Sequence, residues 1–209
     1  MLENLVKEYK KMQNKYGDPN LDSITFGGCK NNPEICFVFM NPTGRNITAN
    51  KEWKGLKAPW IGTKNVWNLF FEIGVINEEI YQEIRSKKGK EWTEDFANKV
   101  YKSVEDNKVY ITNLAKCTQI DARALKDKVF KEYLDLFFKE INIVNPKKII
   151  LFGNQVSSIV LDEKICVSNV RKKEFNYKGF KFYSVYYPVG NGFFNIDKAI
   201  EDIKWIIKN

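Results

Sequence analysis

The chain has 209 residues, 44% of them hydrophobic and 29% charged, which is enough to bury the core of one domain without disulfides or a structural metal. No apolar run approaches the roughly eighteen residues that a membrane-spanning helix needs, so we expect a soluble protein without a membrane partner. The formal net charge is +8, and a basic surface attracts polyanions such as DNA, although lysine-rich surfaces also serve solubility.

The absence of histidine limits the chemistry more than the charge does, because histidine is the commonest general acid or base and the commonest transition-metal ligand. Any catalysis must therefore use amides, carboxylates, tyrosine or bound water. The four cysteines, Cys29, Cys36, Cys117 and Cys166, form no C-x-x-C pair, and we expect reduced thiols without a zinc site. The N-terminal segment lacks the pattern of a signal peptide, and we expect a cytoplasmic protein.

Short β-rich apolar runs alternate with stretches of helical periodicity along the chain. The expected elements are, in chain order, a helix at 2–16, a strand at 35–40, helices at 63–74, 77–86 and 92–104, a strand at 109–112, a helix at 127–143, a strand at 148–152, a helix at 154–161, a strand at 180–187 and a helix at 196–208. Asn195 is the expected N-cap of the last helix. This alternation predicts one α/β domain, residues 1–209, in which helices flank a mostly parallel sheet.

Ligands of open α/β sheets bind beyond the carboxyl ends of the strands. The segments after Met40, Thr112, Phe152 and Tyr187 are therefore the candidate site. Amide side chains stand at two of these exits, in Asn41-Pro42 and in Asn113.

Five segments carry a resemblance to a known family. In chain order they are Met40-Asn41-Pro42, Pro59-Trp60-Ile61-Gly62, Asn113 with Lys116-Cys117, Asn145-Pro146 through Gly153, and Tyr187-Pro188-Val189. In this order and spacing they resemble the uracil-DNA glycosylase superfamily. The body from about Pro59 to Pro188 is most similar to its family-4 branch, whereas the first motif resembles the Asn-Pro form of the mismatch-specific and single-strand-selective branches.

The resemblance implies a fold and an activity. The fold is a three-layer α/β/α sandwich around a central, mostly parallel, four-stranded sheet. The activity is the removal of a damaged base from DNA, in which the base is flipped into a pocket and its bond to the sugar is hydrolysed.

The resemblance also implies two catalytic residues. Asn41 takes the place that positions water, where an amide orients the nucleophile but cannot act as a strong base. Tyr187 stands where most of the family has histidine, whose hydrogen bond stabilises charge on the leaving pyrimidine. A tyrosine hydroxyl still donates a hydrogen bond, but it extends farther, and Val189 replaces the usual serine. These departures place the strength of catalysis in question.

For substrate binding, the resemblance implies Pro42, Trp60, Asn113 and Pro188. Trp60 corresponds to the aromatic residue that stacks on the flipped base. Asn113 corresponds to the base reader, because a carboxamide offers a donor and an acceptor to the N3–H and O4 edge of uracil. Each of these polar and aromatic residues also has an ordinary structural interpretation, as a turn-forming asparagine or a packed aromatic side chain.

The predicted DNA contacts come from two loops. Arg45 and Lys64, near the first two motifs, are candidate phosphate clamps. Gly190, Asn191, Gly192 and Phe193 follow the last motif, where glycines allow close backbone approach and Phe193 or its neighbour Phe194 serves as an apolar wedge. Surface cations and phenylalanines packed beneath the final helix are the structural alternatives.

Family 4 carries an iron-sulfur cluster on four cysteines. Cys117 matches one ligand, but the next ligand position falls near Tyr133, and Cys29 and Cys36 lie too close to the first strand. We therefore expect no cluster, no metal and no other cofactor.

Three functions are compatible with these patterns. The first is a monomeric DNA glycosylase acting on uracil or another deaminated base. The second is a superfamily member that has lost catalysis and binds nucleic acid or a nucleobase, which the missing histidine favours. The third is a doubly wound domain for another small ligand, which predicts no salt-dependent affinity for DNA.

Overall fold

The computed structural model describes residues 2–122 and 125–209. For Asn191 it describes the backbone alone. Its centre is a six-stranded sheet in the order β1-β3-β2-β4-β6-β5. The strands are β1 (Phe26–Gly28), β2 (Ile35–Phe39), β3 (Val109–Asn113), β4 (Lys148–Phe152), β5 (Glu174–Tyr177) and β6 (Phe180–Val185). The four central strands are parallel, and β1 and β5 close the two edges as antiparallel partners of β3 and β6.

The expected parallel strands are present, but the expected number of four strands is wrong because neither edge strand contains the apolar run that marks the other four. β1 is a three-residue strand with two glycines, and β5 reads Glu-Phe-Asn-Tyr, without an apolar run. The turn from β5 to β6 consists of Lys178 and Gly179, both with positive φ, as a two-residue hairpin turn requires.

Seven α-helices cover the sheet in the described part of the chain. They are α1 (Leu2–Tyr16), α2 (Asn65–Glu72), α3 (Glu78–Ser86), α4 (Glu94–Asp106), α5 (Asp127–Val144), α6 (Asn154–Leu161) and α7 (Ile196–Lys208). The side chains of Asn77 and Thr93 cap α3 and α4, whereas the expected cap Asn195 makes no capping hydrogen bond to α7. Among the described residues, no helix is long and apolar enough to cross a membrane.

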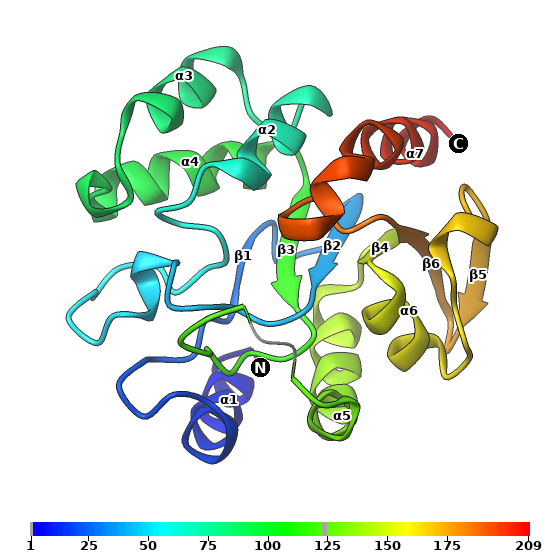
Figure 1. The fold of residues 1–209 in the computed structure, drawn as a ribbon, viewed down its shortest axis with the longest axis horizontal. Helices are drawn as coiled ribbons and strands as arrows, with labels where there is room; N and C mark the ends of the chain where they lie inside the picture. The colour runs from blue at the N-terminus through cyan, green and yellow to red at the C-terminus, as the bar shows by residue number, and fades with distance from the viewer. Residues whose placement is uncertain (1, 123–124) are drawn as a thin grey trace.

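The alternation of side chains along β2 divides the core into two layers. Phe37 and Phe39 pack into the cluster beneath α2, α3, α4 and α7, and Cys36 and Val38 pack into the cluster above α1, α5 and α6, as the two-residue period of a strand requires. The result is the expected three-layer sandwich (Figure 1).

The path of the chain places a crevice between β2 and β4. The connection after β2 runs through α2, α3 and α4 on one face, and the connection after β4 runs through α6 on the other. Adjacent parallel strands whose connections leave to opposite faces form a topological switch point, where α/β sheets bind ligands. The fold therefore points to the carboxyl ends of β2 and β4 as the site.

Candidate functional site

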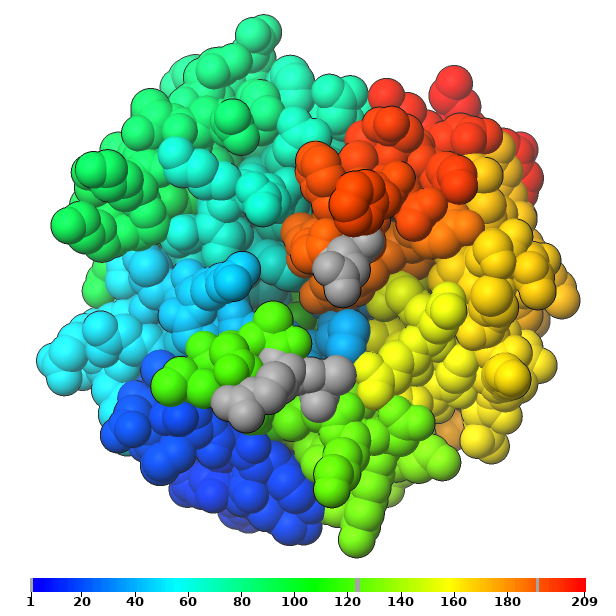
Figure 2. Space-filling view, viewed as in Figure 1, coloured from blue at the N-terminus to red at the C-terminus, as the bar shows by residue number. Residues whose placement is uncertain are grey.

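A cavity of about 870 Å³ opens at this end of the sheet. All four central strands contribute to its wall, through Asn41 after β2, Asn113 at the end of β3, Asn154 after β4 and Tyr187 after β6. Figure 2 shows the hollow at the centre of the visible face, bordered by the loop after β2, the loop after β3 and the segment before α7. The segments that the sequence predicts for the site thus meet at one place.

Two aromatic side chains form opposing parts of the cavity wall around Phe39. The Phe39 ring is wholly buried, with its centroid 4.8 Å from that of Trp60 and 6.2 Å from that of Tyr187, both edge to face. Phe152 stacks on Phe39 with a centroid distance of 4.4 Å and holds it in place. The cavity therefore has a rigid apolar lining that suits a flat aromatic ligand.

Trp60 is held in an uncommon backbone conformation. Its φ is 68°, a left-handed value that is costly for a bulky residue. Its backbone N–H donates to Asn46 Oδ1 at 2.6 Å, and its carbonyl accepts from Trp67 Nε1 at 3.1 Å and from Thr63 Oγ1 at 2.7 Å. These contacts fix the ring at the cavity wall.

Asn46 connects Trp60 to the loop after β2, and sequence reasoning missed it. Its side chain is 5% exposed, and its Nδ2 donates to the carbonyl of Thr43 at 3.1 Å. In the sequence, Asn46 looks like an ordinary turn residue, because no local pattern predicts a hydrogen bond to a residue fourteen positions away.

Asn113 presents an unsatisfied donor at the cavity. It pairs with Phe39 in the parallel β2–β3 ladder, so its side chain lies on the same face of the sheet as the Phe39 ring. The residue is 2% exposed, and its Nδ2 has no hydrogen-bond partner in the described protein. Leaving such a group unpaired costs about 1–3 kcal/mol. A ligand acceptor at this place would recover that cost.

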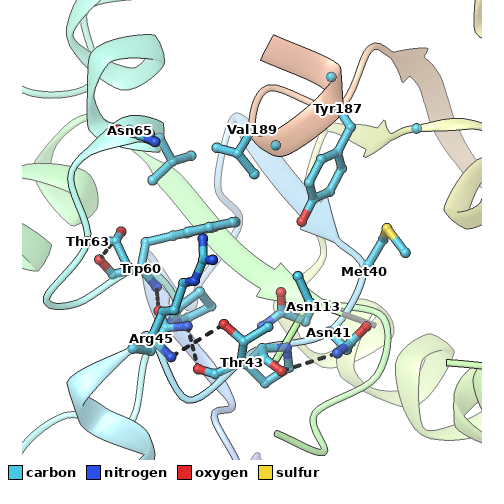
Figure 3. Close-up of a pocket in the computed structure, with 18 of the residues that line it drawn as sticks. Met40, Asn41, Thr43, Arg45, Trp60, Thr63, Asn65, Asn113, Tyr187 and Val189 are labelled. Atoms are coloured by element: carbon cyan, nitrogen blue, oxygen red, sulfur yellow. Dashed lines mark hydrogen bonds between the residues drawn. The ribbon is translucent and has the colours of Figure 1, made fainter. Parts of the chain in front are cut away.

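Tyr187 directs its hydroxyl into the cavity, on the side of Asn113 (Figure 3). Burial raises the pKa of this phenol well above its usual value, so the hydroxyl stays protonated and can donate a hydrogen bond. Gly192 lies against the Tyr187 backbone so closely that a Cβ there would fall 1.9 Å from the Tyr187 carbonyl oxygen. Gly192, predicted as a DNA contact, therefore also secures the position of Tyr187.

Asn41 lies two residues after Phe39, where the chain leaves β2. This end of β2 is next to the end of β3, where Asn113 lies. Its Nδ2 donates to the carbonyl of Pro42 at 3.1 Å, which orients the amide. Within the described residues its Oδ1 has no hydrogen-bond partner, and this oxygen is an acceptor for a water molecule. Pro42 is buried and lines the cavity as well.

The two predicted cations at the cavity differ in their surroundings. Arg45 and Lys64 both line it. The Lys64 amine donates to the carbonyl of Arg85, whereas the exposed Arg45 guanidinium has no acceptor among the described residues. Arg45 is therefore the more readily available phosphate ligand of the two.

The remaining predicted residues are only partly brought to the cavity. Gly190, with φ of 60°, lines it, but Pro188 is buried and does not. Phe193 lies outside the lining with 52% of its surface exposed. The side chain of Asn191 lies outside the described residues.

Several polar lining residues were not predicted individually, namely Thr43, Thr63, Asn65, Asn154 and Gln155. For Asn154 and Gln155 a signal existed, because they follow β4 at an exit where ligands are expected. Asn154 Oδ1 accepts from the backbone N–H of Val167 at 2.9 Å, which makes its side chain part of the wall.

The surroundings of the cysteines can be compared with what the iron-sulfur cluster of family 4 requires, namely four cysteine ligands. Cys117 is buried, and burial raises the pKa of its thiol. Tyr133, close to the expected second ligand position, packs in the same core cluster. The part of the chain that the structure describes brings together no group of three His, Cys, Asp or Glu side chains.

A model of the Uracil DNA glycosylase superfamily matches residues 26–192. The matched stretch runs from β1 to the segment before α7. It contains every predicted site residue except Phe193, which directly follows it. The match extends over most of the chain, and the four-strand parallel core and the cavity at its switch point lie within it. The chain therefore belongs to the uracil DNA glycosylase superfamily.

Proposed function

We propose that the protein is a DNA glycosylase that hydrolyses the N-glycosidic bond of uracil or another deaminated base flipped out of DNA. The observation that carries this proposal is the Asn113 amide at a cavity walled by Trp60 and Tyr187, because its buried Nδ2 has no hydrogen-bond partner among residues 2–122 and 125–209. The O4 oxygen of uracil is an acceptor for this donor, and the amide oxygen of Asn113 accepts from N3–H.

The other cavity residues supply the remaining parts of the reaction. Trp60 stacks on the base, a contact worth about 1–3 kcal/mol. Asn41 Oδ1 orients the attacking water and stabilises positive charge that develops on the sugar. The Tyr187 hydroxyl donates to the departing base anion, and Arg45 binds a flanking phosphate. The oxygen of the water bonds to C1′ as the bond from C1′ to the base breaks, and the proton of the water passes through solvent to the released base anion. No proton leaves a protein group in this scheme, which is consistent with a chain without histidine.

The proposal includes no iron-sulfur cluster and no metal, because the reaction needs only water and oriented dipoles, and Cys117 has no cysteine at the next ligand position. The second candidate is a recognition module that holds the base without cleaving it. It is supported by Tyr187, because a tyrosine replaces the histidine found in most of the family.

Base release from oligonucleotides containing uracil, hypoxanthine or xanthine separates the two functions. We expect the wild-type protein to release at least one of these bases and Asn41→Ala to slow release by about a hundredfold or more, since a positioned dipole of this kind contributes about that factor. Asn65→Ala is the matched control, because Asn65 lines the same cavity and is exposed. Intact strands that nevertheless bind the protein would instead support the recognition module.

The rate of base release is expected to stay constant between about pH 6 and about pH 8.5. The chain has no histidine, no Asp or Glu appears among the described residues that line the cavity, and the raised pKa of Tyr187 keeps its hydroxyl protonated throughout this range. Single-turnover rates across the range test this expectation. A sigmoidal change within it would show that an ionising group acts in the reaction.

Arg45→Ala is expected to weaken DNA binding and to lower the slope of log affinity against log salt concentration by about 0.7–0.9, the value for one lost phosphate contact. Binding titrations at several salt concentrations measure this slope. Lys64→Ala is the comparison variant, since its amine already has a protein acceptor, and we expect a smaller change. A slope identical to that of the wild type in Arg45→Ala would remove Arg45 from the interface.

A further inference from the structure

Lys116 and Glu140 form an ion pair that is completely buried. Both side chains are 0% exposed, and Lys116 Nζ lies 3.0 Å from Glu140 Oε2. Lys116 follows β3 in the chain, and Glu140 lies on α5. The pair thus lies on the face of the sheet where α1 and α5 pack.

The side-chain nitrogen of Lys116 and both carboxylate oxygens of Glu140 have hydrogen-bond partners. Glu140 accepts from the hydroxyls of Tyr9 at 2.5 Å, Tyr110 at 3.2 Å and Thr112 at 2.6 Å. Lys116 Nζ donates to Thr112 Oγ1 at 2.7 Å and also to the backbone carbonyl of Asn113. The last bond connects the buried network to the residue that faces the cavity.

Stability alone gives a weak reason for such a pair. Removing two charges from water is expensive, and replacing a buried ion pair by apolar residues of similar volume is often neutral or stabilising. Burial lowers the pKa of the Lys116 ammonium, and the nearby Glu140 carboxylate opposes this shift. A positional role accounts for the pair better than a gain in folding free energy does.

Asn113 needs such a positional support. Its side-chain Nδ2 has no partner among the described residues, so no hydrogen bond from that atom to them holds the amide in the orientation that reads a base. The place of the amide then depends on the packing around this buried residue and on the position of its main chain. On one side the main chain is held by the β2–β3 ladder, and its carbonyl is held by Lys116.

We propose that Lys116, supported by Glu140, is a positioning residue that fixes the backbone of Asn113 and thereby aims its amide at the flipped base. This inference rests on the proposed base-reading role of Asn113. An error of about 1 Å in the placement of a reacting group can cost about a hundredfold in rate. Lys116 never touches the base in this scheme and acts only through Asn113.

Two variants that differ only at position 116 test the proposal. In Glu140→Gln, Lys116 has lost its counter-ion, and a neutral amine still donates to the Asn113 carbonyl. In Lys116→Met/Glu140→Gln, that donor is absent and no charge remains buried. We expect the double variant to release uracil about 10–100-fold more slowly than Glu140→Gln. The dissociation constant for DNA is expected to agree within about twofold between the two, because no phosphate contact changes.

The matched control is Arg171→Met/Asp202→Asn. It removes another ion pair whose carboxylate is wholly buried, and neither residue lines the cavity. We expect this control to lose stability in urea unfolding but to keep the wild-type rate of uracil release. If Lys116→Met/Glu140→Gln and Arg171→Met/Asp202→Asn both lost rate in proportion to their loss of stability, the loss would be a general effect of destabilisation. That result would overturn the positional role of Lys116.

The outcomes separate this inference from the proposed function. Equal rates in Glu140→Gln and the double variant, with an active wild type, overturn the role of Lys116 alone. A wild-type protein that releases no base overturns the proposed function and this inference with it. If the double variant does not fold, Lys116→Met/Glu140→Met replaces it, because two apolar residues of similar volume also remove the donor to the Asn113 carbonyl and leave no charge buried. We expect about a 10–100-fold loss there as well, and an unchanged rate overturns the inference.

Discussion

Replacing Tyr187 with phenylalanine is expected to slow uracil release about a hundred- to thousandfold, because one donor to the departing anion is lost. The stability of the protein should hardly change. The Tyr187 hydroxyl has no hydrogen-bond partner among the described residues, and the ring contact with Phe39 is retained. Single-turnover rates at saturating enzyme, together with urea unfolding, measure both quantities on the same preparation.

Tyr186→Phe is the matched control for this prediction. Tyr186 also lines the cavity and precedes Tyr187 in the chain, and its ring lies 5.7 Å from the Lys198 amine. We expect it to keep the wild-type rate within about twofold, because the proposed mechanism gives its hydroxyl no part in the reaction. Equal losses in both variants, or no loss in Tyr187→Phe, would show that the Tyr187 hydroxyl does not stabilise the leaving base.

Replacing Asn113 with aspartate is expected to reduce uracil release by about a thousandfold. The change preserves the shape of the side chain but converts the Nδ2 donor to an oxygen, so that an acceptor faces the O4 acceptor of uracil. A carboxylate at this 2% exposed position also lacks a partner, and we expect a loss of stability of about 1–3 kcal/mol. Single-turnover assays on uracil-containing DNA measure the first effect and urea unfolding the second.

Asn65→Asp provides the same change of charge in the same cavity. Asn65 is exposed at the start of α2, so a carboxylate there remains in water. We expect weaker DNA binding from charge repulsion, but a rate at saturating enzyme close to that of the wild type. If Asn65→Asp lost as much rate as Asn113→Asp, the effect would be electrostatic and Asn113 would not be the base reader.

Much of the architecture could be predicted because it depends on local patterns. The runs that form β2, β3 and β4 are apolar and short, and Pro146 separates α5 from β4 as expected. The final strand was predicted to reach Tyr187 but ends at Val185, since the chain leaves the sheet there to form the cavity wall. The edge strands β1 and β5 were missed because neither contains an apolar run: β1 has three residues, two of them glycine, and β5 alternates polar and aromatic residues.

The convergence of the candidate segments could also be predicted, because the carboxyl ends of parallel strands meet at one edge of a sheet. Asn41, Asn113 and Tyr187 follow different strands in the chain and line one cavity in the structure. The chemical roles of these residues remain predictions that the variants above test. Pro188 shows the limit of reasoning by motif, because it belongs to the same segment as Tyr187 and yet does not line the cavity.

The α/β class, the order of the central elements, the resemblance to the superfamily and the absence of histidine all follow from the amino-acid sequence. Periodicity, turn residues and composition are properties of neighbouring residues, and they can be read without coordinates. Three features arise only when the chain folds. Asn46 holds Trp60, Lys116 donates to the Asn113 carbonyl, and Asn113 Nδ2 is left without a partner among the described residues. Those features depend on burial and on contacts between distant segments, which no local pattern encodes.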